Sequence, residues 1–265
     1  MRVIALAAAL LLLANSAFAQ AARVVDVPTR GTTVRALLLL PATPVGSVIL
    51  LAGGHGRLDL AADVRIGWGS GNQLVRTRAA YAAAGYATLV PDIAEDLKTW
   101  DGVAQGYRFS AQHGRDLGAL VAYMRAIRQP VVVVATSRGA VSAGVLLAEA
   151  AAPPTRPDGV VMTAPMLMSI GDRLPNFRMA IGDAPARARL PLLVVGNRRD
   201  TCRYTLPASI DAFVAWHGGA VDVVMLDGPQ GVGDPCEARA AHGFAGIDGE
   251  VVATVTGWIG RRLGR

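Results

Sequence analysis

The chain of 265 residues is long enough for one sizeable domain with a single core, and no repeat or Ser/Gly-rich linker divides it. Hydrophobic residues make up 52% and charged residues 17%, a balance that suits a sheet buried on both faces. The net charge is +6, but the basic residues are scattered, Lys98 is the only lysine and aromatic residues make up 5%. This composition argues against a nucleic-acid-binding surface. Mild attraction to anionic surfaces stays open.

The N-terminus predicts a secretory signal peptide over residues 1–19. Arg2 gives a positive start, residues 3–14 are apolar, and residues 17–19 (Ala-Phe-Ala) form a cleavage signal before Gln20. A membrane anchor is the alternative, but the apolar run is shorter than the roughly 20 residues that a spanning helix needs. No cysteine follows the cleavage site, which argues against a lipid anchor. We expect a mature domain over residues 20–265, exported to the periplasm or the medium, with no later membrane span.

Strands and helices alternate along the mature chain. It opens with strands at 23–27 and 33–40 around a turn at 28–31 (Pro-Thr-Arg-Gly). Further strands are predicted at 47–52, 86–90, 131–136, 159–163, 191–195 and 221–226, and helices at 74–84, 110–128, 140–151, 207–217 and 249–263. Such alternation implies parallel β-α-β units, so we predict an α/β fold with a mostly parallel sheet of about eight strands flanked by helices.

Ser137 follows an apolar strand at an abrupt strand-to-helix turn. Functional groups in parallel sheets collect at the carboxyl ends of the strands, which is where this serine lies. The pattern of a nucleophile elbow is G-x-S-x-G, and residues 135–139 read Ala-Thr-Ser-Arg-Gly, with Ala135 in place of the first glycine. The neighbours must be small because their backbones crowd the turn. Ser137 is therefore the candidate nucleophile.

A glycine-rich loop at residues 53–56 (Gly-Gly-His-Gly) follows the strand at 47–52. Glycines allow a backbone to approach a reacting carbonyl closely. Backbone N–H groups fixed there can each contribute about 3–4 kcal/mol to the transition state of acyl transfer. Gly54 is the candidate for the first donor, and Arg138, which follows the serine, for the second. A plain glycine turn is the alternative.

An acid and a base follow the later strands. Asp200 ends the loop at 196–200, where an ordinary salt bridge with neighbouring arginines is the alternative. His242 lies in the loop after the last strand, and a histidine pKa near neutrality suits a general base. Of the four histidines only His242 follows both the serine and the acid. The others, His55, His113 and His217, are expected to cap, pack or contact water, and His55 is the one that could line the site.

The two cysteines, Cys202 and Cys236, predict a disulfide because their number is even and the chain is expected to be exported. Metal ligands or free thiols are the alternatives, and no Cys-x-x-Cys or His-rich spacing supports a metal site. A bridge would stabilise the fold by roughly 3–4 kcal/mol in the chain-entropy model. It would also tie the loop of Asp200 to the loop of His242.

The order Ser137, Asp200, His242 resembles that of the α/β-hydrolase superfamily, over essentially the whole mature chain. Residues 71–76 (GNQLVR), 136–139 (TSRG) and 234–237 (DPCE), with the His-Gly pair at 242–243, look like a group of exported bacterial α/β-hydrolases of undefined substrate. The resemblance implies a serine hydrolase without cofactor or metal. Residues 52–54 (Ala-Gly-Gly) depart from the pattern, since many relatives begin this loop with a histidine that orders it.

We therefore expect an exported ester hydrolase that forms an acyl-enzyme with a small-molecule acyl substrate. A peptidase or acyltransferase with the same triad, and a non-catalytic binding protein, are the alternatives. Residues 164–190 offer a small lid with Met166, Met168, Phe177 and Met179, or ordinary packing, and no large cap domain is expected.

Overall fold

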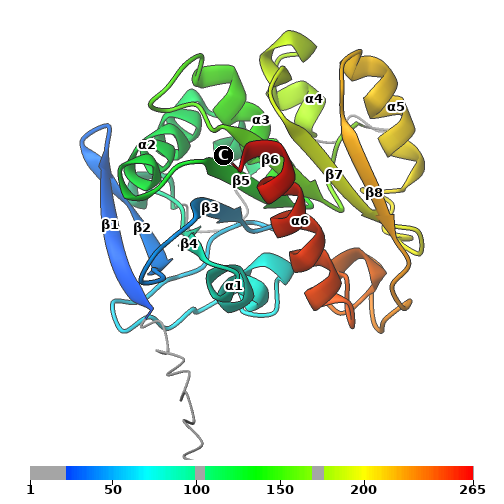
Figure 1. Cartoon of the computed structure of the whole chain (residues 1–265), viewed down its shortest axis with the longest axis horizontal. Helices are drawn as coiled ribbons and strands as arrows, with labels where there is room; N and C mark the ends of the chain where they lie inside the picture. The colour runs from blue at the N-terminus through cyan, green and yellow to red at the C-terminus, as the bar shows by residue number, and fades with distance from the viewer. Residues whose placement is uncertain (1–21, 99–104, 169–175, 265) are drawn as a thin grey trace, which may run out of the picture.

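The computed structural model describes residues 22–98, 105–168 and 176–264 (Figure 1). One sheet of eight strands has the order β1-β2-β4-β3-β5-β6-β7-β8. The strands are β1 (Arg23–Thr29), β2 (Thr32–Leu39), β3 (Gly46–Leu51), β4 (Tyr86–Pro91), β5 (Val131–Thr136), β6 (Gly159–Thr163), β7 (Leu192–Asn197) and β8 (Asp222–Leu226). The β1–β2 and β2–β4 pairs are antiparallel, and β3 to β8 pair in parallel, which confirms the predicted class.

Helices cover both faces of the sheet (Figure 1). They are α1 (Gln73–Ala83), α2 (Ala111–Ile127), α3 (Gly139–Glu149), α4 (Phe177–Ala180), α5 (Ala208–His217) and α6 (Asp248–Leu263), with the 3-10 turns η1 (Glu95–Leu97), η2 (Gln105–Phe109), η3 (Pro185–Ala188) and η4 (Ala241–Gly243). Helices α1 and α6 pack on one face, and α2 to α5 on the other. In the described ranges no helix combines the length and the apolar character needed to cross a membrane.

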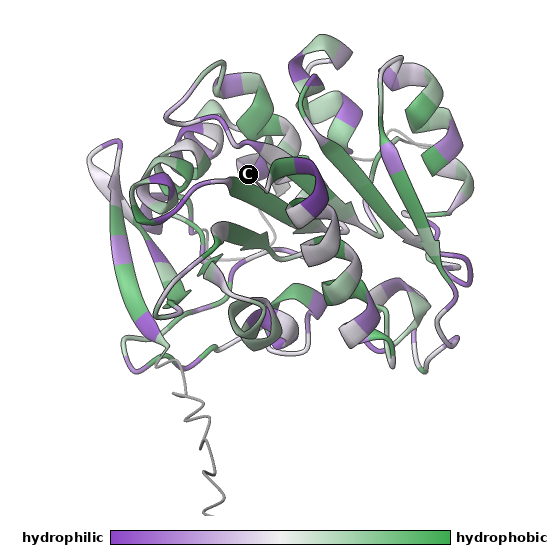
Figure 2. Ribbon diagram, in the orientation of Figure 1, coloured by the Kyte–Doolittle hydropathy of each residue, from purple (hydrophilic) through white to green (hydrophobic). Residues whose placement is uncertain are grey.

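Strand β5 shows how the sequence produces these two cores. Val133 and Ala135 belong to the cluster with α2 and α3, whereas Val132 and Val134 belong to the cluster with α1 and α6. Successive side chains of a strand point to opposite faces, so a strand buried on both faces is a continuous apolar run. Figure 2 shows this as a hydrophobic sheet between helices of mixed character.

The first turn is tighter than the sequence indicated. Pro28 and Thr29 pair with Thr33 and Thr32, so only Arg30 and Gly31 form the turn, at φ 46° and 82°. Such two-residue turns match the twist of antiparallel strands. The two strands therefore pair closer to the turn than the Pro-Thr-Arg-Gly stretch at 28–31 indicated.

In the described part of the segment at 164–190, two of the four residues named for a lid pack in the core. Met166 and Phe177 are buried, and the Phe177 ring meets Phe213 edge-on at a centroid distance of 5.6 Å, whereas Met179 is 50% exposed. Helix α4 has only four residues, too few for a periodic signal, and was not predicted. The predicted lid also includes residues 169–175, which lie outside the described residues, as does the predicted signal peptide.

Candidate active site

Ser137 lies at the sharp corner between β5 and α3 with φ 52°. Its N–H donates to the Thr163 carbonyl at 3.0 Å, and its own carbonyl accepts from Met166 at 3.1 Å. Positive φ is strained for a non-glycine residue and is characteristic of a nucleophile elbow. Ala135 is fully buried within β5, and the elbow forms with alanine there.

The elbow requires a small residue two positions after Ser137, and the surroundings of Gly139 show why. A Cβ at Gly139 would lie 2.5 Å from the Leu51 carbonyl oxygen, where no side chain fits. Gly53 plays the corresponding part across the turn, since a Cβ there would lie 3.0 Å from the Cβ of Ser137. Glycine at both positions thus lets β3, its loop and the elbow meet at backbone distance.

Asp200 and His242 are adjacent and buried. The Nδ1 atom of His242 lies 3.1 Å from Oδ2 of Asp200 and 2.9 Å from Oγ1 of Thr205. The Thr205 hydroxyl donates its one proton to the same Asp200 oxygen at 2.9 Å. His242 Nδ1 must therefore be the donor to both neighbours, which leaves Nε2 free to accept a proton.

Ser137 and His242 line one pocket of about 290 Å³ at the carboxyl edge of the sheet. Its other walls come from the glycine loop, Trp68, the segment at 69–73, and residues 236–238 and 243. The Ser137 hydroxyl makes no hydrogen bond to His242 within the described chain. Catalytic contacts of this kind are often long without substrate and tighten when it binds.

Two backbone donors border Ser137 without a partner. Among the described residues, the N–H groups of Gly54 and Arg138 make no hydrogen bond. Gly54 has φ 56° and lies against Trp68, so that a Cβ would meet the indole at 2.6 Å. The two donors named from the sequence are thus free to bind an oxyanion.

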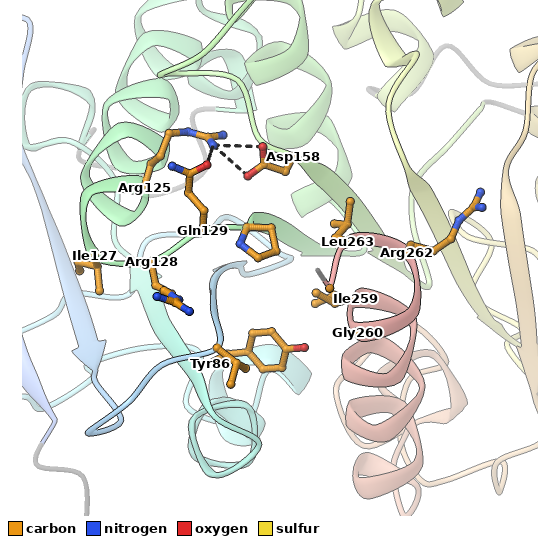
Figure 3. A pocket seen from close by; sticks show the side chains of 13 residues that line it. Tyr86, Arg125, Ile127, Arg128, Gln129, Asp158, Ile259, Gly260, Arg262 and Leu263 are labelled. Atoms are coloured by element: carbon orange, nitrogen blue, oxygen red, sulfur yellow. Dashed lines mark hydrogen bonds and ion pairs between the residues drawn. The ribbon is translucent and has the colours of Figure 1, made fainter.

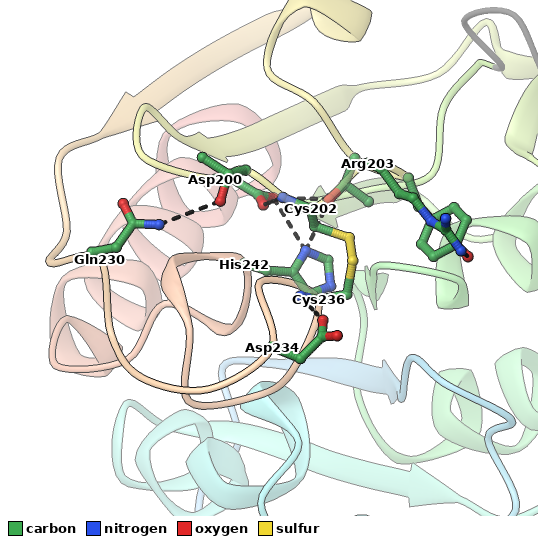
Figure 4. Close-up of a disulfide and its surroundings, with 10 residues drawn as sticks. Asp200, Cys202, Arg203, Gln230, Asp234, Cys236 and His242 are labelled. Atoms are coloured by element: carbon green, nitrogen blue, oxygen red, sulfur yellow. Dashed lines mark hydrogen bonds and ion pairs between the residues drawn. A yellow bond between two sulfur atoms is a disulfide. The ribbon is translucent and has the colours of Figure 1, made fainter.

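Cys202 and Cys236 form a disulfide with a Cα–Cα distance of 4.6 Å. Figure 4 shows it beside His242 and Asp200, with Cys202 on the acid loop and Cys236 on the histidine loop. The Cys202 N–H also donates to the second oxygen of Asp200 at 2.8 Å. The bridge and the carboxylate therefore fix the same turn.

Two further side chains hold the histidine loop, and the sequence alone did not single them out for this role. The Asn197 amide at the end of β7 donates to the Ala241 carbonyl at 2.8 Å. The Arg76 guanidinium donates to the carbonyls of Ala238 and Gly243 at 3.1 and 2.6 Å and pairs with Asp248. Arg76 belongs to the segment at 71–76 that carried the resemblance, which was the one available signal.

The surroundings of the other three histidines indicate structural roles. His113 and His217 are buried, at 2.9 Å from Ser142 Oγ and 3.2 Å from the Ala188 carbonyl. His55 does not line the pocket; its ring stacks on Trp68, which does, at a centroid distance of 3.7 Å. Burial, the largest cause, lowers the pKa of His55.

A second and larger recess lies at the opposite edge of the sheet (Figure 3). This amino-edge hollow, about 1030 Å³, is lined by Val45, Tyr86, Arg125, Ile127, Arg128, Gln129, Pro130, Asp158, Ile259, Gly260, Arg262, Leu263 and Gly264. It contains no serine, cysteine or histidine. In the described ranges, no three His, Cys, Asp or Glu side chains gather in a way that could hold a metal ion.

Known structures share this arrangement of sheet and helices. A dienelactone hydrolase from Anabaena variabilis has 16% identity and a TM-score of 0.62, over 92% of this chain and 98% of its own. An esterase from Pyrococcus furiosus has 14% identity and a TM-score of 0.63, over 92% of each chain. An α/β serine hydrolase homologue from Coxiella burnetii has 16% identity and a TM-score of 0.57, over 88% and 95%. This chain has the α/β-hydrolase fold.

At these identities the likeness extends to the fold and not to the reaction. No protein-family model matches the sequence, and no curated protein matches it. The candidate nucleophile Ser137, the candidate acid Asp200 and the candidate base His242 follow one another in the order in which α/β-hydrolases place residues with these roles.

Proposed function

We propose that this protein is an exported serine hydrolase that cleaves carboxylic esters. Ser137 attacks the acyl carbonyl while His242 Nε2 takes its proton, and Asp200 stabilises the resulting imidazolium. The N–H groups of Gly54 and Arg138 bind the oxyanion of the tetrahedral intermediate. His242 then protonates the leaving alkoxide, and water cleaves the acyl-enzyme with His242 as the base.

The observation that carries this proposal is the contact of His242 Nδ1 with both Asp200 Oδ2 and Thr205 Oγ1, with the Thr205 hydroxyl turned to Asp200. It supports the tautomer that a general base needs, in a pocket that also contains Ser137. The dienelactone hydrolase and the esterases among the structural neighbours support ester cleavage rather than another reaction. The apolar N-terminus and the disulfide support export.

The pocket supports a substrate of modest size. Its volume of about 290 Å³ is at the lower end of small-molecule sites. We therefore expect short acyl chains to be preferred. A peptidase would need an extended groove for its substrate, and the described pocket offers a compact recess instead.

The test is hydrolysis of nitrophenyl esters from acetate to decanoate by the wild-type protein and by Ser137→Ala. Turnover should peak at a short chain and fall by several orders of magnitude in the variant. Ser47→Ala is the matched control, because this buried serine at the amino end of β3 donates to the carbonyls of Met124 and Arg128 at the end of α2, away from the pocket. It should lose stability and keep its kcat.

A fluorophosphonate probe separates the alternatives. Labelling of Ser137 without ester turnover would indicate a peptidase or acyltransferase. If neither labelling nor turnover occurred, the catalytic proposal would be wrong and a binding protein would be favoured.

A further inference from the structure

The glycine loop after β3 is held by a buried arginine on a distant segment. Arg108, in η2, is only 3% exposed. Its Nη2 lies 3.1, 3.5 and 3.3 Å from the carbonyl oxygens of Ala52, Gly53 and Gly54. The neighbouring Tyr107 hydroxyl donates to the next carbonyl, that of His55, at 2.8 Å. Two adjacent side chains thus hold four successive carbonyls.

Arg108 has no acidic partner here. Its Nη1 donates to Ser142 Oγ at 2.5 Å, and no carboxylate in the described chain lies within ion-pair distance. Burial lowers the pKa of Arg108, although a guanidinium stays charged at neutral pH. A buried cation without a counter-ion is costly, and the hydrogen bonds of Arg108 to the loop carbonyls and to Ser142 are the contacts that offset this cost.

The geometry of the peptide unit links these contacts to the active site. In a trans peptide the C=O and the following N–H point in opposite directions within one plane. The Gly53 carbonyl and the Gly54 N–H belong to one peptide, and the Gly54 carbonyl and the His55 N–H to the next. Fixing both carbonyls on Arg108 therefore directs both N–H groups away from the guanidinium.

Gly56 is needed for this arrangement. It has φ 78°, and a Cβ there would lie 2.2 Å from Nη2 of Arg108 and 2.6 Å from the Tyr107 hydroxyl. The third glycine of the loop thus makes room for the two anchoring side chains. The first two, at Gly53 and Gly54, make room for the elbow and Trp68.

We propose that Arg108 and Tyr107 are positioning residues for the oxyanion hole, which hold the glycine loop by its carbonyls so that its N–H groups face Ser137. The proposal rests on the proposed function for its catalytic part. It explains how a loop that begins Ala-Gly-Gly, without the usual ordering histidine, keeps a defined shape.

The experiment uses Arg108→Met, which keeps the aliphatic stem and removes all four contacts of the guanidinium. Arg156→Met is the matched control, because Arg156 donates to two carbonyls, those of Ala150 and Arg187, on another part of the molecule. Titration with a fluorophosphonate counts the competent sites, so that kcat is expressed per active serine. Hydrogen exchange of the peptide covering residues 52–58 reports the order of the loop without requiring activity.

For Arg108→Met we expect kcat per titrated site to fall about 100-fold with a KM within a few-fold of wild type, because the loop contacts act in the transition state. Exchange over residues 52–58 should become faster. Arg156→Met should melt earlier, with kcat and loop exchange unchanged. Tyr107→Phe, which loses a single hydrogen bond, should lower kcat about 10-fold.

Unchanged kcat per site, or unchanged exchange of the loop, in Arg108→Met would overturn the proposal. If Arg108→Met does not fold, the same two measurements on Tyr107→Phe decide. If the wild-type protein is not labelled by the fluorophosphonate and does not turn over esters, the proposed function has failed. Hydrogen exchange of the glycine loop then tests by itself whether Arg108 anchors that loop.

Discussion

The pocket at the carboxyl edge of the sheet and the amino-edge hollow differ in how their polar groups are used. In the hollow, the Arg125 guanidinium bonds to Asp158 and Gln129 (Figure 3). It also donates to the Arg156 carbonyl, so its donors are satisfied within the protein. At the carboxyl edge, the described N–H groups of Gly54 and Arg138 have no partner. The hollow is the larger recess, yet the pocket has the groups that a reaction can use.

Polar groups that lack a partner and are held in place by many contacts therefore indicate a functional site better than the volume of a recess does. At the carboxyl edge, several contacts hold Asp200 and the loop of His242 in place. Asp200 is fixed by Cys202 and Thr205, and the loop of His242 by Arg76 and Asn197. Each of these supporting contacts can be removed by a single substitution, and a comparable contact in the amino-edge hollow can be removed as a control.

Asp200→Asn should cause the greatest loss. An amide at this position donates toward His242 Nδ1 and favours the tautomer with the proton on Nε2, which cannot act as a base. We expect kcat per titrated site to fall about 10⁴-fold. Asp158→Asn in the hollow also replaces a carboxylate that accepts from a backbone N–H and from Arg125, and it should keep its kcat. A fall of less than tenfold in Asp200→Asn would remove Asp200 from the triad.

Removal of the disulfide should act mainly on stability. The bridge closes a loop with a sequence separation of 34 residues, for which the chain-entropy model gives about 4 kcal/mol. Urea denaturation of a Cys202→Ala, Cys236→Ala double variant should show a loss of this order. Addition of a reductant should destabilise the wild type and leave the double variant unchanged. Equal sensitivity of both proteins to the reductant would contradict the assignment.

Acid should destabilise the protein through His113, whose ring contacts the Ser142 hydroxyl that also binds Arg108. Desolvation by burial, with the positive charges of Arg108 and Arg30, lowers the pKa of His113 to about 3. The ordinary histidine pKa is about 6.5, so between pH 6.5 and 3 the unfolded chain binds a proton that the folded chain does not. The contribution of His113 to the free energy of unfolding is therefore fully present above pH 6.5. On acidification it falls by up to about 1.4 kcal/mol per pH unit.

His113→Gln removes this titration and keeps an acceptor for the Ser142 hydroxyl. The unfolding free energy of the variant, from urea titrations between pH 7 and 4.5, should depend less steeply on pH than that of the wild type. Carboxylates titrate in both proteins, so the difference between the two slopes is the measurement. Equal slopes would show that His113 is protonated normally in the folded state.

The sequence predicted the strands and the longer helices and named the three candidate catalytic residues, but it did not predict the side chains that hold those residues in place. Apolar runs at 131–136 and 191–195 indicate buried strands, because burial on both faces leaves a local signature. Ser137, Asp200 and His242 follow strand ends, so topology alone brings them to one edge. Thr205, Arg108 and Asn197 contact partners 37, 56 and 44 residues away, and no local pattern encodes such pairings.

Thr205→Val tests one of these supporting side chains. It removes one acceptor of His242 Nδ1 and one donor to Asp200, while the direct contact between them remains. We expect kcat to fall about 10-fold, the value of one hydrogen bond near 1.4 kcal/mol. Thr88→Val is the control, since Thr88 is also buried but bonds to the Tyr86 carbonyl within β4. If both variants kept full activity, Asp200 alone would orient the base.

Arg125→Met tests the hollow, and its expected effect is the smallest. The side chain pairs with a partly exposed Asp158 and bonds to the Arg156 carbonyl, so we expect a loss of about 1 kcal/mol in urea denaturation and no change in kcat. An unchanged kcat would mean that the contacts of Arg125 in the amino-edge hollow do not influence the reaction in the pocket. A fall in kcat comparable to that of Thr205→Val would instead mean that the two edges are coupled through β5, which begins beside Asp158 and ends next to Ser137.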